Sequence, residues 1–113
     1  MVGKSFPKRI GSAPEAVATV VYSRRSLEDL ERAIGFLVAE SPMAAIDAVQ
    51  AVRSAIEHLA PHPLLGRRVE GEIRELVISY GKTGYLALYR FVAPADEIRV
   101  LTIRHQREIG YRP

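Results

Sequence analysis

The sequence predicts an α+β domain with the element order β-α-α-β-β-β, in which an antiparallel helix hairpin packs on one face of a small, mainly antiparallel four-stranded sheet. Three observations carry this prediction. A short β-branched run lies at residues 18–22, and two stretches with helical spacing of apolar residues follow between residues 26 and 60. Residues 73–107 then hold three strand-like runs separated by two short turns. Helices followed by a block of strands are typical of the α+β class.

The length and composition fit one soluble domain. A chain of 113 residues can bury a core of its own, and 48% of its residues are hydrophobic. Residues 1–17 mix Gly, Pro, Ser and Lys without a period, so we expect a basic flexible arm before a single domain at residues 18–113. The apolar runs are too short for a bilayer and no signal-peptide pattern is present. The sequence therefore predicts a cytoplasmic protein with no membrane partner.

The first predicted elements are a strand and a helix. Ala18 to Tyr22 reads "ATVVY", which favours a strand. Ser26 is expected to cap the following helix, with Asp29 three residues later facing the free amides of the first turn. The helix ends near Glu40, and its apolar positions recur at helical spacing: Leu27, Leu30, Ile34, Leu37 and Val38.

A second helix is expected to begin at once. Ser41 suits an N-cap and Pro42 the first helical position, where the missing amide hydrogen costs nothing. The helix should run to about Ala60 with one apolar face, made by Ile46, Val49, Val52, Ile56 and Leu59. With almost no linker between them, the two helices must form an antiparallel hairpin.

The rest of the chain predicts a three-stranded meander. Pro61-His62-Pro63 stops the second helix, and Arg67 and Arg68 stand on an exposed connection. Strands are expected at Ile73–Tyr80, Tyr85–Val92 and Glu97–His105, joined by turns at residues 81–84 and 93–96. Alternation is blurred, so both sheet faces are partly covered. The hairpin can cover one face, and a partner or a shallow groove is the simplest account of the other.

The charge distribution indicates an anionic partner. Net charge is +3. Residues 61–113 hold six acidic and nine basic groups, and Lys82 is the only lysine among the nine basic residues. Arginine's planar fork suits bidentate contact with carboxylate or phosphate, so an acidic peptide or a nucleic acid is implied. A solvated arginine-rich surface is the alternative for any single residue.

No metal or cofactor is indicated. The chain has no cysteine, which excludes disulfides, thiolate metal sites and cysteine nucleophiles. His58 and His62 lack a metal-ligand spacing relative to each other or to His105.

The order of these elements and several short motifs resemble the RelE/ParE superfamily of type II toxin–antitoxin toxins, also described as plasmid stabilisation proteins. The motifs are "RELVI" at residues 74–78, "YLALYR" at 85–90 and "IRVLTIRHQRE" at 98–108. The "SP..A" opening of the second helix and "P..LGR" from Pro61 belong to the same pattern. Each motif is short, but together they cover about Ala18 to Glu108.

The resemblance implies a growth-inhibiting toxin held inactive by a cognate antitoxin, whose acidic, amphipathic C-terminal segment would wrap it. ParE-like members poison DNA gyrase, and RelE-like members cut messenger RNA on the ribosome. A third alternative is an inactive relic or a plain binding module that kept the fold. The residues expected to bind such partners are Arg67, Arg68, Arg74, Arg90, Arg104, His105 and Arg107.

RNA cleavage without a metal needs a group that activates the 2′-hydroxyl, a donor for the leaving oxygen and cations for the phosphate. The candidates for these roles, if the chain is RelE-like, are His105, Arg74, Arg90, Tyr85, Tyr89 and Glu75. His105 is the best acid–base candidate because an unperturbed imidazole titrates near neutral pH.

The ending of the chain favours the ParE-like alternative. RelE-like members typically present a denser lysine and arginine cluster and a catalytic tyrosine or histidine at the extreme C-terminus, which residues 110–113 do not match closely. Each candidate also has a structural interpretation: His105 can cap the last strand, Tyr85 and Tyr89 can pack, and Glu75 can pair across to Arg90 or Arg99 to fix sheet register.

Overall fold

The computed structural model describes residues 17–81 and 83–106 of the chain. The expected basic arm lies outside these residues except for Val17, and Lys82 and Arg107 also lie outside them. The elements in chain order are β1 (Thr19–Tyr22), α1 (Arg24–Glu40), α2 (Pro42–Glu57), β2 (Arg67–Glu70), β3 (Ile73–Tyr80), β4 (Thr83–Val92), the short 3-10 helix η1 (Ala93–Ala95) and β5 (Glu97–His105).

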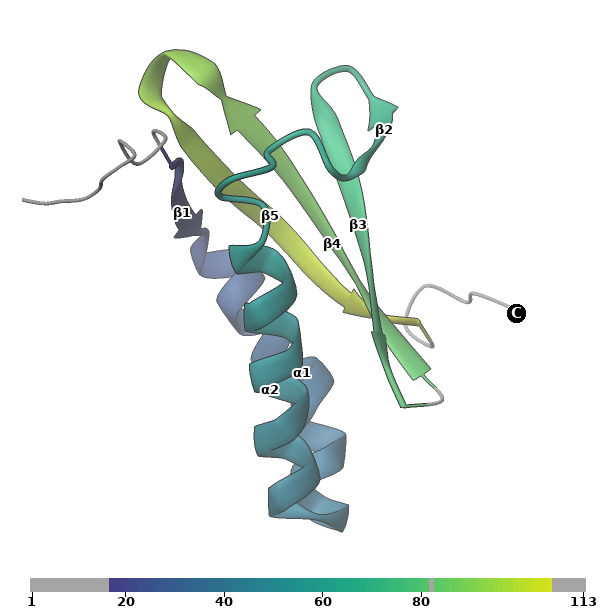
Figure 1. Cartoon of the computed structure of the whole chain (residues 1–113). Helices are drawn as coiled ribbons and strands as arrows, with labels where there is room; N and C mark the ends of the chain where they lie inside the picture. Colours follow the sequence, from purple (N-terminus) through teal and green to yellow (C-terminus); the bar gives the residue numbers. More distant parts are fainter. Residues whose placement is uncertain (1–16, 82, 107–113) are drawn as a thin grey trace, which may run out of the picture.

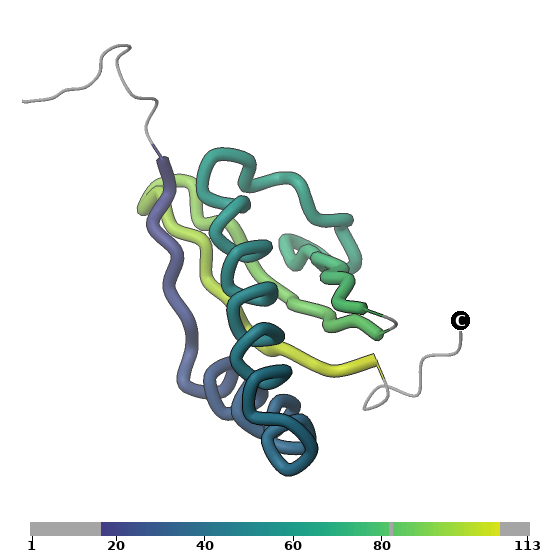
Figure 2. Tube along the Cα trace, turned by 60° about the horizontal axis from the view of Figure 1, so that its bottom comes forward, coloured from purple at the N-terminus to yellow at the C-terminus, as the bar shows by residue number. Residues whose placement is uncertain are grey.

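The architecture is α+β, as predicted, with two layers. The helices α1 and α2 run side by side as a hairpin against the sheet (Figure 1). The sheet has five strands in the order β1-β5-β4-β3-β2. β1 pairs with β5 in parallel, while the other neighbours are antiparallel. The tube in Figure 2 shows the purple N-terminal strand lying beside the yellow β5, so the first and last strands are neighbours in the sheet, with β1 at its edge.

The strand count differs from the four that the sequence predicts. The connection that carries Arg67 and Arg68 forms β2, which pairs antiparallel with β3 through Arg67↔Glu75 and Arg68↔Arg74. Gly71, at φ +54°, makes the turn between the two strands, in a region of φ that favours glycine. All four residues of β2 are exposed, so no alternation of apolar and polar residues marks it in the sequence.

The first helix begins earlier than predicted because Ser23, not Ser26, is its N-cap. The amide of Ser26 donates to Ser23 Oγ at 2.9 Å, and Ser26 Oγ donates back to the Ser23 carbonyl at 2.8 Å. Ser23 Oγ also donates to the Leu101 carbonyl of β5, 78 positions away. Asp29 therefore lies inside α1 instead of near its first amides. The predicted end at Glu40 is confirmed.

The second helix has the predicted start, with Ser41 accepting a hydrogen bond from the Ala44 amide and Pro42 in the first helical position. It ends at Glu57, three residues before the predicted Ala60. Val52, Ile56 and Leu59 are buried as expected, but Ile46 is 51% exposed. The small residues Ala45 and Ala48 are buried in its place.

The core lies between the hairpin and one face of the sheet. Its sheet side includes Tyr85, Ala87 and Tyr89 of β4 together with Ile98, Val100 and Ile103 of β5. The register of β4 against β5 shifts between Leu88 and Tyr89: Leu88 pairs with Thr102 and Tyr89 with Val100. Leu101 is the extra residue of this irregularity on β5, where simple alternation of side chains is interrupted.

The other face of the sheet carries no helix in the part of the chain that the structure describes. Val77 on that face is 69% exposed. Among the described residues, no helix combines the length and the hydropathy that crossing a membrane requires.

Candidate functional site

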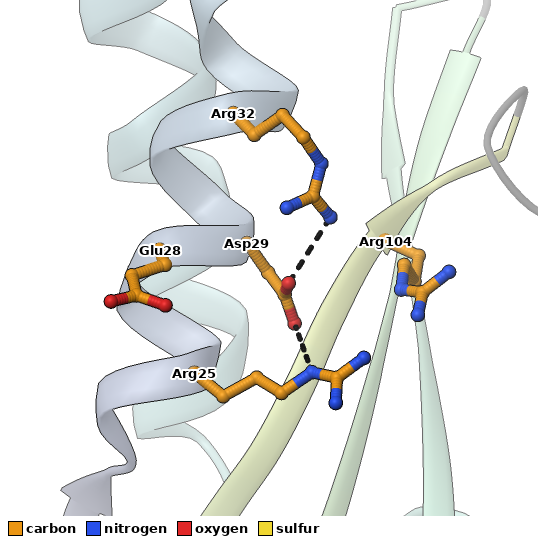
Figure 3. A pocket seen from close by; sticks show the side chains of 5 residues that line it. All are labelled: Arg25, Glu28, Asp29, Arg32 and Arg104. Carbon is orange, nitrogen blue, oxygen red and sulfur yellow. Dashed lines mark hydrogen bonds and ion pairs between the residues drawn. The ribbon is translucent and has the colours of Figure 1, made fainter.

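An arginine cleft lies between α1 and β5, formed by Arg25, Asp29 and Arg32 from the helix and Arg104 from the strand (Figure 3). Asp29 is 3% exposed and sits at its centre. Its Oδ1 accepts a hydrogen bond from Arg32 Nη2 at 3.1 Å, and its Oδ2 lies 3.9 Å from Arg25 Nε. The helical spacing of these residues, three and four positions from Asp29, allows one carboxylate to hold both guanidinium groups.

Asp29 also joins α1 to the sheet. Its Oδ2 accepts a hydrogen bond from the backbone amide of Ile103 at 3.2 Å. β1 pairs with β5 only as far as Val100, so a carboxylate takes the position that a neighbouring strand would occupy farther along β5. The buried side chain of Asp29 thus fixes the distance between the helix and β5, and with it the width of the arginine cleft.

Arg104 faces this cleft with an unsatisfied donor. Arg104 Nε is buried and has no hydrogen-bond partner among the described residues. Figure 3 shows Glu28, the remaining residue at the cleft, directed away from the other four side chains. The cleft therefore holds three guanidinium groups against one buried carboxylate.

An apolar groove lies on the neighbouring side of α1. Its apolar lining is Leu27, Leu30, Ile34 and Val38 of α1 with Val49 of α2. Leu27 and Val38 are each 52% exposed. Glu28 borders both the apolar groove and the arginine cleft, so the two features are adjacent on one helix.

Arg74 and Tyr89, two of the residues considered for catalysis, hold the loop before β2. Tyr89 is fully buried; its hydroxyl donates to the Pro63 carbonyl and accepts from the Gly66 amide, both at 2.8 Å. Arg74 Nη1 donates to the Gly66 carbonyl at 2.8 Å and to the Leu64 carbonyl at 3.3 Å. Burial raises the pKa of Tyr89, although the Gly66 amide and the Arg74 charge act in the opposite direction.

Tyr85 and His105 face each other across β4 and β5 on the helix-covered side of the sheet. Their rings make an edge-to-face contact with centroids 5.1 Å apart. His105 Nε2 lies 2.7 Å from Thr83 Oγ1. Tyr85 is 1% exposed and His105 is half-buried, so only the histidine is open to solvent.

The remaining predicted residues are divided between regions of the surface. Glu75 accepts hydrogen bonds from Arg67 of β2 at 2.6 and 3.2 Å, not from Arg90 or Arg99 as the sequence suggested. Arg68 Nε donates to the Gly71 carbonyl. Arg90 stands opposite Arg99 on the uncovered face, whereas Arg74 stands opposite Tyr89 on the covered one. These arginines therefore lie on different parts of the surface and do not form one groove.

The arginine cleft contains residues that sequence reasoning missed. The sequence alone does not single out Arg25 or Arg32, and it predicts Asp29 in the first turn of the helix, where the structure does not place it. The spacing of Arg25, Asp29 and Arg32 by four and three residues indicates that they share one face of a helix and can form ion pairs. The approach of this helix face to Arg104 depends on tertiary packing. Within residues 17–81 and 83–106, no group of three His, Asp or Glu side chains is placed to hold a metal ion.

Comparison with known proteins identifies the class. Residues 20–110 match the model of the ParE toxin family, described as the ParE toxin of the type II toxin–antitoxin system parDE. The chain belongs to this family, within the RelE/ParE superfamily, and the predicted resemblance is confirmed. It is a toxin of a type II toxin–antitoxin system.

Individual relatives carry both names of the superfamily. The chain is 41% identical to Toxin RelE3 of Caulobacter vibrioides over 86 residues, which cover 76% of this chain and 88% of that protein. It is 32% identical to Toxin RelE1 of the same organism over 90 residues, covering 80% and 95%. A structure of the chromosomal ParDE system from P. aeruginosa matches with a TM-score of 0.67 at 22% identity, covering 80% of this chain and 98% of that one.

Proposed function

We propose that this toxin is ParE-like, inhibits DNA gyrase by binding it, and has no active site of its own. The observation that supports this most directly is the structural use of the candidate nuclease groups. Tyr85 and Tyr89 are buried, and Arg74 donates to the carbonyls of the loop before β2. A general acid or base must reach its substrate within hydrogen-bond distance, which a fully buried tyrosine hydroxyl between two backbone groups does not allow.

We also infer that a cognate antitoxin holds the toxin inactive through an acidic, amphipathic C-terminal segment. The matched P. aeruginosa structure is described as a toxin–antitoxin system, which supports a partner of this kind. On this chain, exposed apolar side chains and the arginines of the cleft lie on adjacent sides of α1. A segment that folds on binding can bury the apolar side chains and pair its carboxylates with arginines.

A RelE-like ribosome-dependent endoribonuclease is the second candidate. Two observations favour it: the two curated relatives are named RelE3 and RelE1, and His105 is half-buried beside the hydroxyl of Thr83. An imidazole in this position is open to a substrate and is chemically able to act as a general acid or base.

Expression of the chain without its antitoxin separates these activities. We expect growth arrest, inhibition of supercoiling when the purified chain is added to DNA gyrase, and no codon-linked cleavage in primer extension on messenger RNA from the arrested cells. Cleavage that disappears in His105→Ala would favour the RelE-like candidate, and unhindered growth at a verified protein level would contradict both candidates.

A further inference from the structure

We propose that the free edge of β1 pairs with β1 of a second copy of this chain, so that two sheets join into one across a two-fold axis. β1 is the outermost strand, with β5 on one side and no strand of the described residues on the other (Figure 1, Figure 2). The inference concerns the toxin when no other protein covers this edge, and it depends neither on the cellular target nor on the antitoxin.

The first argument is a set of backbone groups without partners. Thr19 and Ser23 donate their amides to carbonyls of β5 at 2.9 and 3.1 Å. Residues alternate in direction along a strand, so the amides and carbonyls of Val20 and Tyr22 point to the open side. These groups have no backbone partner in the part of the chain that the structure describes. Such a row of groups is a template for another strand.

The second argument is that the two edges of the sheet differ in their protection against pairing. The opposite edge strand, β2, reads "RRVE" and has a register irregularity against β3. Charged side chains and bulges are devices by which proteins prevent contact between sheet edges. β1 reads "TVVY" and carries no charge, no proline and no register shift against β5. The sheet is therefore open to strand addition at β1 and protected at β2.

The third argument is the length of the free edge, which is limited at both ends. The amide of Ala18 donates to the Ala60 carbonyl at 3.2 Å, and Ser23 leaves the strand as the N-cap of α1. A long peptide would therefore find no backbone donors beyond those of Val20 and Tyr22. A second β1 supplies a segment of matching length, and a two-fold axis makes the contact isologous.

One register uses all of these backbone groups. Antiparallel pairing centred on Val21 sets Val20 of one copy opposite Tyr22 of the other, so both residues form hydrogen-bonded pairs. Val20 and Tyr22 pack against the core, and this register keeps them on the helix side of the sheet in both copies. Val21, which is 40% exposed, then faces its own copy across the axis on the side without a helix.

Charges at the two ends of the paired segment are complementary. Arg24 begins α1 directly after β1, and Asp96 lies beside the start of β1, since its carbonyl accepts the Thr19 amide. Both residues are exposed, and neither makes an ion pair within residues 17–81 and 83–106. The antiparallel arrangement brings Arg24 of one copy toward Asp96 of the other at both ends.

Sedimentation of the full chain over a wide range of concentration tests the pairing. The toxin is obtained by co-expression with its antitoxin, followed by release in denaturant and refolding. We expect a dimer whose fraction rises with concentration. Val21→Lys sets like charges opposite each other at the axis and should weaken association by about tenfold or more. The matched control is Val69→Lys on β2, at a position 41% exposed, which should change association by about twofold or less.

A mixture of two variants tests the axis itself. Val21 faces its own copy in the proposed register, so Val21→Lys and Val21→Glu should each be monomeric alone. When the two variants are mixed, opposite charges meet at the axis and association should return. A partner surface elsewhere on the molecule would not produce this recovery.

A cross-link tests the register without adding charge. The chain has no cysteine, and Val21 would form a non-hydrogen-bonded pair with Cα atoms about 4.5 Å apart, which a disulfide can span. Val21→Cys should give a disulfide-linked dimer on mild oxidation, whereas Val69→Cys should stay largely monomeric. This measurement remains informative if the charged variants fold poorly, because cysteine is small and apolar.

Three results would contradict the inference. One is a wild-type chain that sediments as a monomer at every concentration. Another is a dimer that Val21→Lys leaves unchanged or that Val69→Lys weakens equally, which would place the contact elsewhere. The last is a mixture of the charged variants that stays monomeric together with a Val21→Cys chain that forms no cross-link, which would exclude the register. Each of these results would leave the proposed gyrase inhibition and the antitoxin partner intact.

Discussion

Tyr89 shows how one side chain can fix a loop. Its hydroxyl spans the Pro63 carbonyl and the Gly66 amide, so Tyr89→Phe leaves two buried backbone groups without their partner. We expect a loss of about 1–3 kcal/mol in the free energy of unfolding at pH 7, measured by urea denaturation. Tyr80→Phe is the control, since its hydroxyl makes a single 3.1 Å bond to the Ala44 carbonyl and should cost less.

The contribution of the Tyr89 hydroxyl to the free energy of unfolding should depend on pH in a defined direction. Burial raises the pKa of Tyr89 above its ordinary value of 10.0, so the folded state releases this proton at higher pH than the unfolded state. The stability from the neutral hydroxyl is complete below pH 10 and is lost as pH rises through the folded-state pKa. The stability difference between wild type and Tyr89→Phe should therefore shrink above pH 10. A difference that grows there would contradict the burial argument.

Asp29 is the residue on which the arginine cleft depends. Asp29→Ala removes the acceptor for the Ile103 amide and the contact with Arg32, and we expect a loss of about 2–3 kcal/mol in the free energy of unfolding. Asp47→Ala, at an exposed position of α2, should stay within about 0.5 kcal/mol of wild type. Equal denaturation midpoints for the two variants would show that Asp29 does not join α1 to β5.

At the residue scale, the sequence predicts packing and charge pairing but not the tertiary partners. Strand position and charge suffice to predict that Tyr89 packs or that Glu75 pairs with an arginine. It could not assign the partners of Asp29 or Arg104, because the amide of Ile103 and the cleft are brought to them only by packing of α1 on β5.

Two glycines give opposite predictions at the scale of the elements. Gly35 lies at an exposed position of α1, and a Cβ added there would meet nothing within 4 Å. At Gly66 an added Cβ would lie 2.6 Å from Tyr89 Cε1 and 2.8 Å from the Glu75 carbonyl oxygen. We expect Gly35→Ala to stabilise by about 0.5–1 kcal/mol and Gly66→Ala to destabilise by about 1–3 kcal/mol, measured by denaturation. The opposite order would contradict the packing of the loop on β4.

The elements themselves were largely predictable. Apolar periodicity located both helices and β3, β4 and β5, since each has a buried side with the spacing of its own secondary structure. The sequence does not predict β2, because all residues of this strand are exposed and show no apolar periodicity. The start of α1 was misplaced because Ser23 and Ser26 are equally good caps in sequence, and the contact of Ser23 with Leu101 is formed only in the folded protein.

At the scale of the whole molecule, partner binding should appear as stability. If the antitoxin binds only the folded toxin, its addition raises the unfolding temperature with the logarithm of its concentration. An excess of 100-fold over Kd corresponds to about 2.7 kcal/mol of stabilisation, which thermal scanning detects. The variant Leu27→Lys tests the apolar groove, because Leu27 lines it and is 52% exposed. We expect the free variant to keep the unfolding temperature of the wild type, and the antitoxin to raise that temperature by less than it does for the wild type. An undiminished shift would exclude the groove from the interface.

The parallel pairing of β1 with β5 also constrains how the toxin is made. Thr19 pairs with Glu97, and Ser23 is bonded to a residue 78 positions farther along the chain. Ile98, Val100 and Ile103 of β5 lie at the centre of the core, so a nascent chain without β5 exposes what they cover. Such non-local contacts form late and slowly. A chain that ends before β5 lacks both the partner of β1 and part of the core, so we expect the toxin to fold only after β5 has been synthesised.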